Sequence, residues 1–135
     1  MSKEIKPTPI GELQKVRKKF KDGEVVELPA FDDGQEFSAK LKRLSLLEMI
    51  KTEVIPNALL AAAQEIYEGK QRADIKKYAQ VLDIICGQAM VEPAFEDVAD
   101  ILTDGQKIAI YTYSQHGVAG LEPFRIFSKL KSKKD

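Results

Sequence analysis

Apolar residues recur at helical spacing along most of the chain, and one stretch instead holds a short β-prone run (Val25, Val26 and Leu28) followed by an alternating run (Phe37, Ala39 and Leu41). Within residues 24–43, two short apolar runs flank the turn sequence Asp32-Asp33-Gly34. Alternation with a period of two is typical of half-buried strands, and an Asp-Gly pair suits the reversal between them. The pattern therefore predicts a β-hairpin over 24–43.

Helical spacing returns after the hairpin. Ser45-x-x-Glu48 and Thr103-x-x-Gln106 both match the capping box, in which a hydroxyl and a Glu or Gln side chain satisfy the first free amides of a helix. The spacing predicts five to six helices from Ser45 to about residue 127. We expect the fold class to be mainly α (α+β), with an N-terminal β-hairpin packed on a bundle of five to six helices.

A further helix is predicted ahead of the hairpin. Ile10, Leu13, Val16 and Phe20 share one side of it, and basic residues fill the other positions. Residues 1–9 hold two prolines and no periodic pattern, which indicates a flexible arm. The expected organisation is thus an arm at 1–9, a single α-rich domain at 10–127 and a basic tail at 128–135.

Charge is distributed unevenly, although the 21 basic and 21 acidic residues of this 135-residue chain cancel. Seven basic and two acidic residues lie in 1–21, and five basic and one acidic lie in 125–135, so an acidic middle separates two basic ends. Basic ends can contact nucleic acid, but they can equally be solvated or lie on the acidic body, and we favour the second interpretation. No apolar run is long enough to span a bilayer, and residues 1–10 lack the apolar core of a signal peptide.

Side chains that carry out catalysis are scarce. His116 is the only histidine and Cys86 the only cysteine, so neither a zinc site nor a disulfide can form within the chain. The apolar neighbours of Cys86 favour a buried thiol. No glycine-rich phosphate loop is present. We therefore expect a protein that is not an enzyme and uses no cofactor or metal.

Aromatic residues gather in the last quarter of the chain. Tyr111 and Tyr113 lie two positions apart on one predicted helix, so they point to different sides of it. If one side packs on the core, the other is exposed or covered by a partner. The candidate partner-binding residues are Tyr111, Tyr113, Phe124 and Phe127, and core packing of the same residues is the alternative.

Several short motifs are similar to those of one known family. They are Phe31-Asp32-Asp33-Gly34, Ser45-Leu46-Leu47, Ile55-Pro56-Asn57-Ala58-Leu59-Leu60, Leu102-Thr103-Asp104 and, near the end, Gly117-Val118 with Phe124-Arg125. Over about residues 24–127 the chain resembles the tail assembly chaperones of long-tailed phages and prophages of Gram-positive bacteria. It departs from that pattern at residues 51–54, where a glycine is more usual before Ile55-Pro56-Asn57.

The resemblance implies a function. Such chaperones bind the tape-measure protein and keep it soluble until the tail tube assembles around it. They act in the host bacterial cytoplasm and are absent from the mature virion. For this chain the resemblance implies the tape-measure protein as partner. The exposed aromatic residues leave self-association as a further option, and the apolar and charge patterns argue against a membrane or nucleic-acid partner.

Two other functions stay open at this point. The chain can be a structural tail or head component that is retained in the virion. It can also be a small nucleic-acid-binding regulator that uses its basic ends.

Overall fold

The computed structural model describes residues 5–70 and 74–122. The described residues form six α-helices, three strands and two short 3₁₀ segments. In chain order these are α1 (Ile10–Lys21), β1 (Glu24–Leu28), β2 (Phe37–Leu41), α2 (Leu46–Lys51), η1 (Asn57–Leu59), α3 (Leu60–Glu68), α4 (Ile75–Ala89), β3 (Met90–Glu92), α5 (Phe95–Val98), α6 (Asp104–His116) and η2 (Gly117–Leu121). The prediction of a mainly α (α+β) fold is confirmed.

The predicted hairpin is present. β1 and β2 pair antiparallel, with Glu24 opposite Leu41 and Leu28 opposite Phe37. Gly34 closes the turn with a φ of 90°, a left-handed conformation that glycine adopts without a steric penalty. Its N–H donates to the Phe31 carbonyl over 2.9 Å. The Asp-Asp-Gly sequence therefore makes the turn for which its residues are suited.

A third strand, β3, was not predicted. It pairs antiparallel with the inner strand β2, so the sheet order is β1-β2-β3. Just before it, the N–H of Lys42 donates to the Ala89 carbonyl over 2.9 Å, which holds the end of α4 against the end of β2. A strand of three residues is too short to show alternation, so its position depends on this contact between distant parts of the chain.

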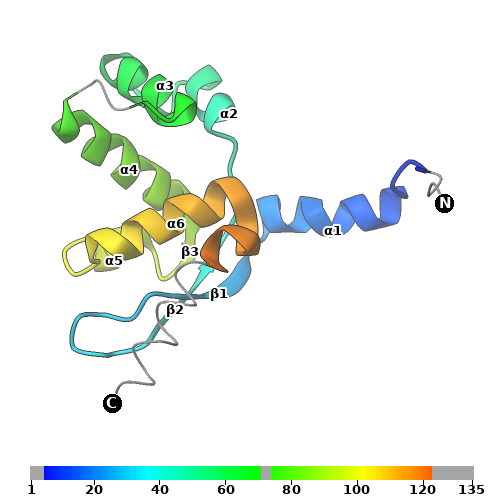
Figure 1. Ribbon diagram of the computed structural model, residues 1–135, viewed down its shortest axis with the longest axis horizontal. Helices are drawn as coiled ribbons and strands as arrows, with labels where there is room; N and C mark the ends of the chain where they lie inside the picture. Colours follow the sequence, from blue (N-terminus) through cyan, green and yellow to red (C-terminus); the bar gives the residue numbers. More distant parts are fainter. Residues whose placement is uncertain (1–4, 71–73, 123–135) are drawn as a thin grey trace.

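The buried side chains form two clusters that share α4. One cluster joins one face of the sheet to α4 and α6, and the other joins α2, α3 and α4. Figure 1 shows α2 and α3 at one end of the body, the sheet at the other, and α4 and α6 between them. The helix α6 is therefore covered on more than one side, so Tyr111 and Tyr113 each pack against one of the two clusters.

The predicted cap at the start of α6 is confirmed as a complete capping box. The Thr103 hydroxyl accepts from the Gln106 N–H over 3.0 Å, and the Gln106 side-chain oxygen accepts from the Thr103 N–H over 2.9 Å. The amide nitrogen of the fully buried Gln106 then donates to the Pro29 carbonyl over 2.9 Å. One side chain thus starts the helix and ties it to the hairpin.

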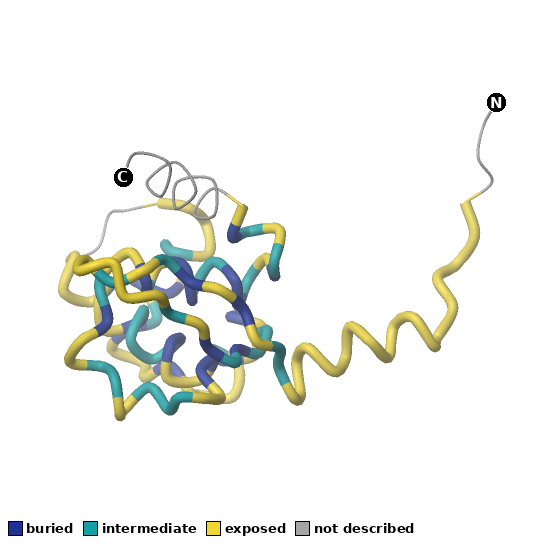
Figure 2. Tube along the Cα trace, turned by 90° about the horizontal axis from the view of Figure 1, so that it is seen from below, coloured by how far each residue is buried: buried dark blue, intermediate teal, exposed yellow. Residues whose placement is uncertain are grey.

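The predicted helix α1 is present, but it lies apart from the rest of the molecule. Figures 1 and 2 show it projecting from the body, and none of its twelve residues is buried. Asp22 and Gly23 connect it to β1. At Gly23 the φ is 83°, and an added Cβ would lie 2.6 Å from the Leu41 carbonyl oxygen, so the connection requires glycine.

Candidate partner-binding arm

The apolar side of α1 is the candidate functional surface. Its four side chains recur at intervals of three and four residues, so they lie along one side of the helix. In the order Ile10, Leu13, Val16 and Phe20 they are 65%, 44%, 45% and 39% exposed. We call these four residues the α1 stripe. Amphipathic helices of globular proteins usually turn this side to the core, so an exposed stripe indicates a surface that binds another molecule.

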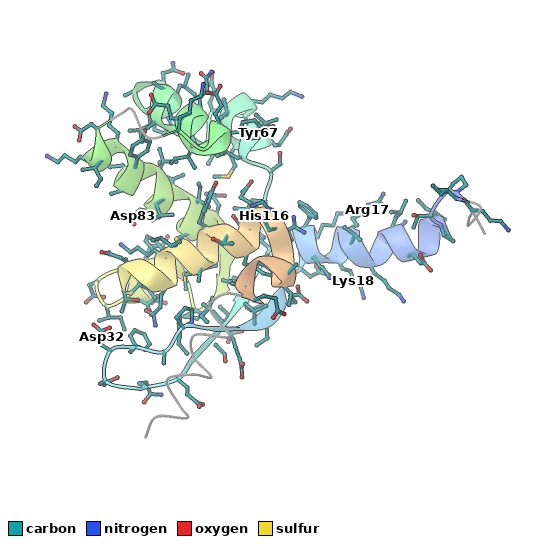
Figure 3. All side chains as sticks on the ribbon, viewed as in Figure 1. Arg17, Lys18, Asp32, Tyr67, Asp83 and His116 are labelled. Carbon is teal, nitrogen blue, oxygen red and sulfur yellow. The ribbon has the colours of Figure 1, made fainter. Side chains whose placement is uncertain are left out.

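Basic side chains cover the remainder of α1. Residues 10–21 contain five basic residues and one acidic residue, which gives a formal charge of +4. Successive residues lie about 100° apart around an α-helix, so the five basic side chains spread around α1 and border the stripe on both edges instead of forming one separate face; Figure 3 labels two of them, Arg17 and Lys18. Such a surface suits a partner whose apolar residues are flanked by acidic ones.

The base of α1 is held to the body at Arg43, directly after the hairpin. The Arg43 N–H donates to the Lys19 carbonyl over 2.9 Å. Its guanidinium carbon lies 5.2 Å from the centre of the Phe20 ring, a cation–π contact. The arm therefore leaves the body from a fixed point, while the stripe beyond Phe20 extends away from it.

The expectation that Tyr113 faces a partner is wrong. Its ring is completely buried, and its hydroxyl donates to a carboxylate oxygen of Glu24 over 2.7 Å. Burial, the hydrogen bond and the negative charge of Glu24 all raise the pKa of Tyr113 above its ordinary value. The reasoning from sequence assumed that only one side of α6 is covered. The sheet packs on one side of α6, however, and α4 and the second cluster pack on another.

The other three aromatic candidates have different outcomes. Tyr111 is half-buried against the cluster of α2, α3 and α4, and burial raises the pKa of its hydroxyl. It is therefore mainly a packing residue with a partly accessible edge. Phe124 and Phe127 lie outside the described residues, so their candidate role stays a prediction.

Cys86 and His116, the single cysteine and histidine of the sequence, lie in different surroundings. Cys86 is buried, as predicted, and burial raises the pKa of its thiol to about 12. His116 ends α6 on the surface (Figure 3). In the described part of the chain, no three His, Cys, Asp or Glu side chains gather closely enough to hold a metal ion.

Comparisons with known proteins add no family to this picture. No family model, no curated protein and no solved structure matches the chain. Within residues 5–70 and 74–122, no helix is long and apolar enough to cross a membrane.

The α1 stripe was visible in the sequence but was not recognised as a candidate surface. The spacing of its residues correctly predicted a helix, and such spacing usually means packing on the core. Two signals mark this helix: five of its twelve residues are basic, and Asp22-Gly23 separates it from the hairpin. A strongly basic amphipathic helix that is separated from the next element by an Asp-Gly pair is a reasonable candidate for an arm.

Proposed function

We propose that this protein is a non-catalytic tail assembly chaperone that binds a tape-measure protein through the α1 arm. The exposed α1 stripe is the observation that carries the proposal, because Ile10, Leu13 and Val16 remain 44–65% exposed on a helix that projects from the body. The motif resemblance over about residues 24–127 supplies the identity of the partner. In this account the protein acts in the host cytoplasm and is left out of the finished virion.

A tape-measure protein is long, largely helical and apolar along part of its surface until the tube encloses it. A helix such as α1 can lie along an exposed apolar stripe, as amphipathic helices do in hydrophobic grooves. Shielding both surfaces from water prevents the partner from associating with other copies of itself. The basic border of α1 then favours segments of the partner in which acidic residues flank the apolar ones.

Each arm binds weakly by itself. Covering the exposed part of four side chains contributes roughly 1 kcal/mol per side chain, or about 4 kcal/mol in total. Association entropy costs a similar amount or more, so a single contact has low affinity. Several copies on one long partner increase the overall binding by multivalency, and each can still dissociate when the tube replaces it. Weak and repeated contacts suit a chaperone that must leave.

Co-expression with the tape-measure protein of the same phage tests the proposal. The wild-type chain should increase the soluble fraction of the partner. The double substitution L13S/V16S should abolish this effect without unfolding the body, because both side chains are exposed. The matched control is K15S/K18S, which changes two residues of the same helix away from the stripe and should retain the effect.

The basic character of α1 supports one alternative, a nucleic-acid-binding regulator. In that case the control variant K15S/K18S should weaken DNA binding and L13S/V16S should not, since phosphate contacts depend on the lysines. DNA binding would also weaken steeply with salt, whereas binding through the stripe would not. If neither variant alters the solubility of the tape-measure protein, α1 is not its binding element.

A further inference from the structure

Arg43 holds contacts to two parts of the chain that are distant in sequence. On one side its N–H and its guanidinium contact Lys19 and Phe20 in the last turn of α1. On the other side its guanidinium contacts the end of α6. The Nε donates to the Ser114 carbonyl over 3.2 Å, and Nη2 donates to the Gln115 carbonyl over 2.9 Å.

The end of α6 is well suited to hold a guanidinium. The last carbonyls of a helix lack partners within the helix and carry the negative end of its dipole. The planar, forked guanidinium reaches two of these carbonyls at once and keeps one flat side free for an aromatic ring. The N–H of Leu44 also donates to the Ser114 carbonyl, over 3.0 Å. Both the main chain and the side chain at this point are therefore fixed to α6.

Gly117 provides the space that this arrangement needs. A Cβ at this position would lie 3.2 Å from Nη1 of Arg43, a tight contact that would require the guanidinium to shift. The φ of Gly117 is 72°, a left-handed conformation that glycine tolerates best. The chain thus leaves α6 in a way that admits the guanidinium beside the helix end.

We propose that Arg43 is the positioning residue of the α1 arm. Its guanidinium, held flat by the two α6 carbonyls, is a platform for the Phe20 ring and sets the direction in which α1 leaves the body. This step rests on the proposed function, because direction matters only if the arm binds a partner. An arm already held in place loses less conformational entropy on binding than one that swings, so Arg43 strengthens binding without contacting the partner.

Distances between spin labels measure the direction of the arm in the protein alone. The labels are placed on K15C in α1 and D100C after α5, both exposed, while the native Cys86 is buried. The wild-type chain should give a single narrow distance distribution. Arg43→Ala should replace it with a broad one, and Arg43→Lys should also broaden it, because an ammonium cannot bond both carbonyls and stack on the ring.

Arg17→Ala is the matched control, since Arg17 lies on the arm and bonds within it, to Gln14 over 2.9 Å. It should leave the distribution narrow. A distribution that stays narrow and unmoved in Arg43→Ala overturns the proposal, and so does a broad distribution in the wild-type chain.

Solubilisation of the tape-measure protein then separates an effect of Arg43 on the direction of the arm from an effect on the stability of the fold. Arg43→Ala should reduce the soluble fraction of the partner more than Thr103→Ala does, at matched fractions of folded chaperone. Thr103→Ala weakens the cap of α6 but does not touch the arm. Equal effects of the two variants would mean that the direction of the arm is irrelevant to binding. If the wild-type chain has no effect on the partner, the proposed function fails, whereas the label distances still decide what holds the arm.

Discussion

Replacement of Tyr113 tests whether its burial is structural. Tyr113→Ala removes a fully buried ring from the cluster between the sheet and α6, along with the hydrogen bond to Glu24. Loss of a large buried side chain of this kind costs about 4 kcal/mol, through lost burial and the cavity that remains. A typical domain has a total stability of about 5–15 kcal/mol, so the variant should stay folded with a clearly reduced free energy of unfolding.

The conservative change Tyr113→Phe separates the hydroxyl from the ring. It keeps the packing and leaves Glu24 without its donor, which costs about 1–2 kcal/mol because the half-buried carboxylate can still contact water. Urea unfolding measures both variants, with the midpoint decreasing and the slope unchanged if only the folded state is affected. In thermal unfolding, Tyr113→Ala should lower the midpoint by about 12 °C, at about 3 °C per kcal/mol for a chain of this length.

Tyr67→Ala is the matched control, because that ring is 57% exposed and its loss should change stability by less than about 0.5 kcal/mol. The reasoning is refuted if Tyr113→Ala is as stable as Tyr67→Ala. It is also refuted if Tyr113→Ala, at a temperature where it is folded, binds the tape-measure protein much more weakly than the wild-type chain.

Three further predictions concern the body. Glu53 has a φ of 63° after α2, so Glu53→Gly should raise the free energy of unfolding by about 0.5–1 kcal/mol and move the urea midpoint to a higher concentration; a lower midpoint would contradict this. The thiol of Cys86, with its pKa raised to about 12 by burial, should react with a thiol reagent at pH 8 only after unfolding, and rapid labelling of the folded chain would disprove its protection. Gln106→Ala should cost about 1–3 kcal/mol in chemical unfolding, because it leaves the Thr103 N–H and the Pro29 carbonyl unpaired, whereas an unchanged midpoint would show that these bonds contribute little.

Local chemistry explains why much of the fold could be predicted from the sequence. The turn at Gly34 and the box formed by Thr103 and Gln106 each require particular side chains within a few residues. The structure has them at the predicted positions. Glu53, between α2 and Pro56, has a φ of 63°, a conformation that glycine adopts more easily than glutamate.

Contacts between distant segments explain what the sequence did not reveal. The strand β3 exists because it meets β2, and its three residues carry no pattern of their own. Tyr113 was assigned to a partner because periodicity describes the sides of one helix and not the number of neighbours that cover them. The α1 stripe has the same periodicity as a core-facing helix, and only the arrangement in space shows that the body leaves it exposed.

Hydrogen exchange of the α1 amides, with and without the tape-measure protein, tests the central claim most directly. The N–H groups of an isolated, exposed helix open readily, so residues 10–21 should exchange quickly in the protein alone. The account predicts that the partner slows hydrogen exchange in residues 10–21 more than in any segment of the body. A complex in which residues 10–21 exchange as quickly as before, while another segment becomes protected, would contradict the claim that α1 is the binding arm.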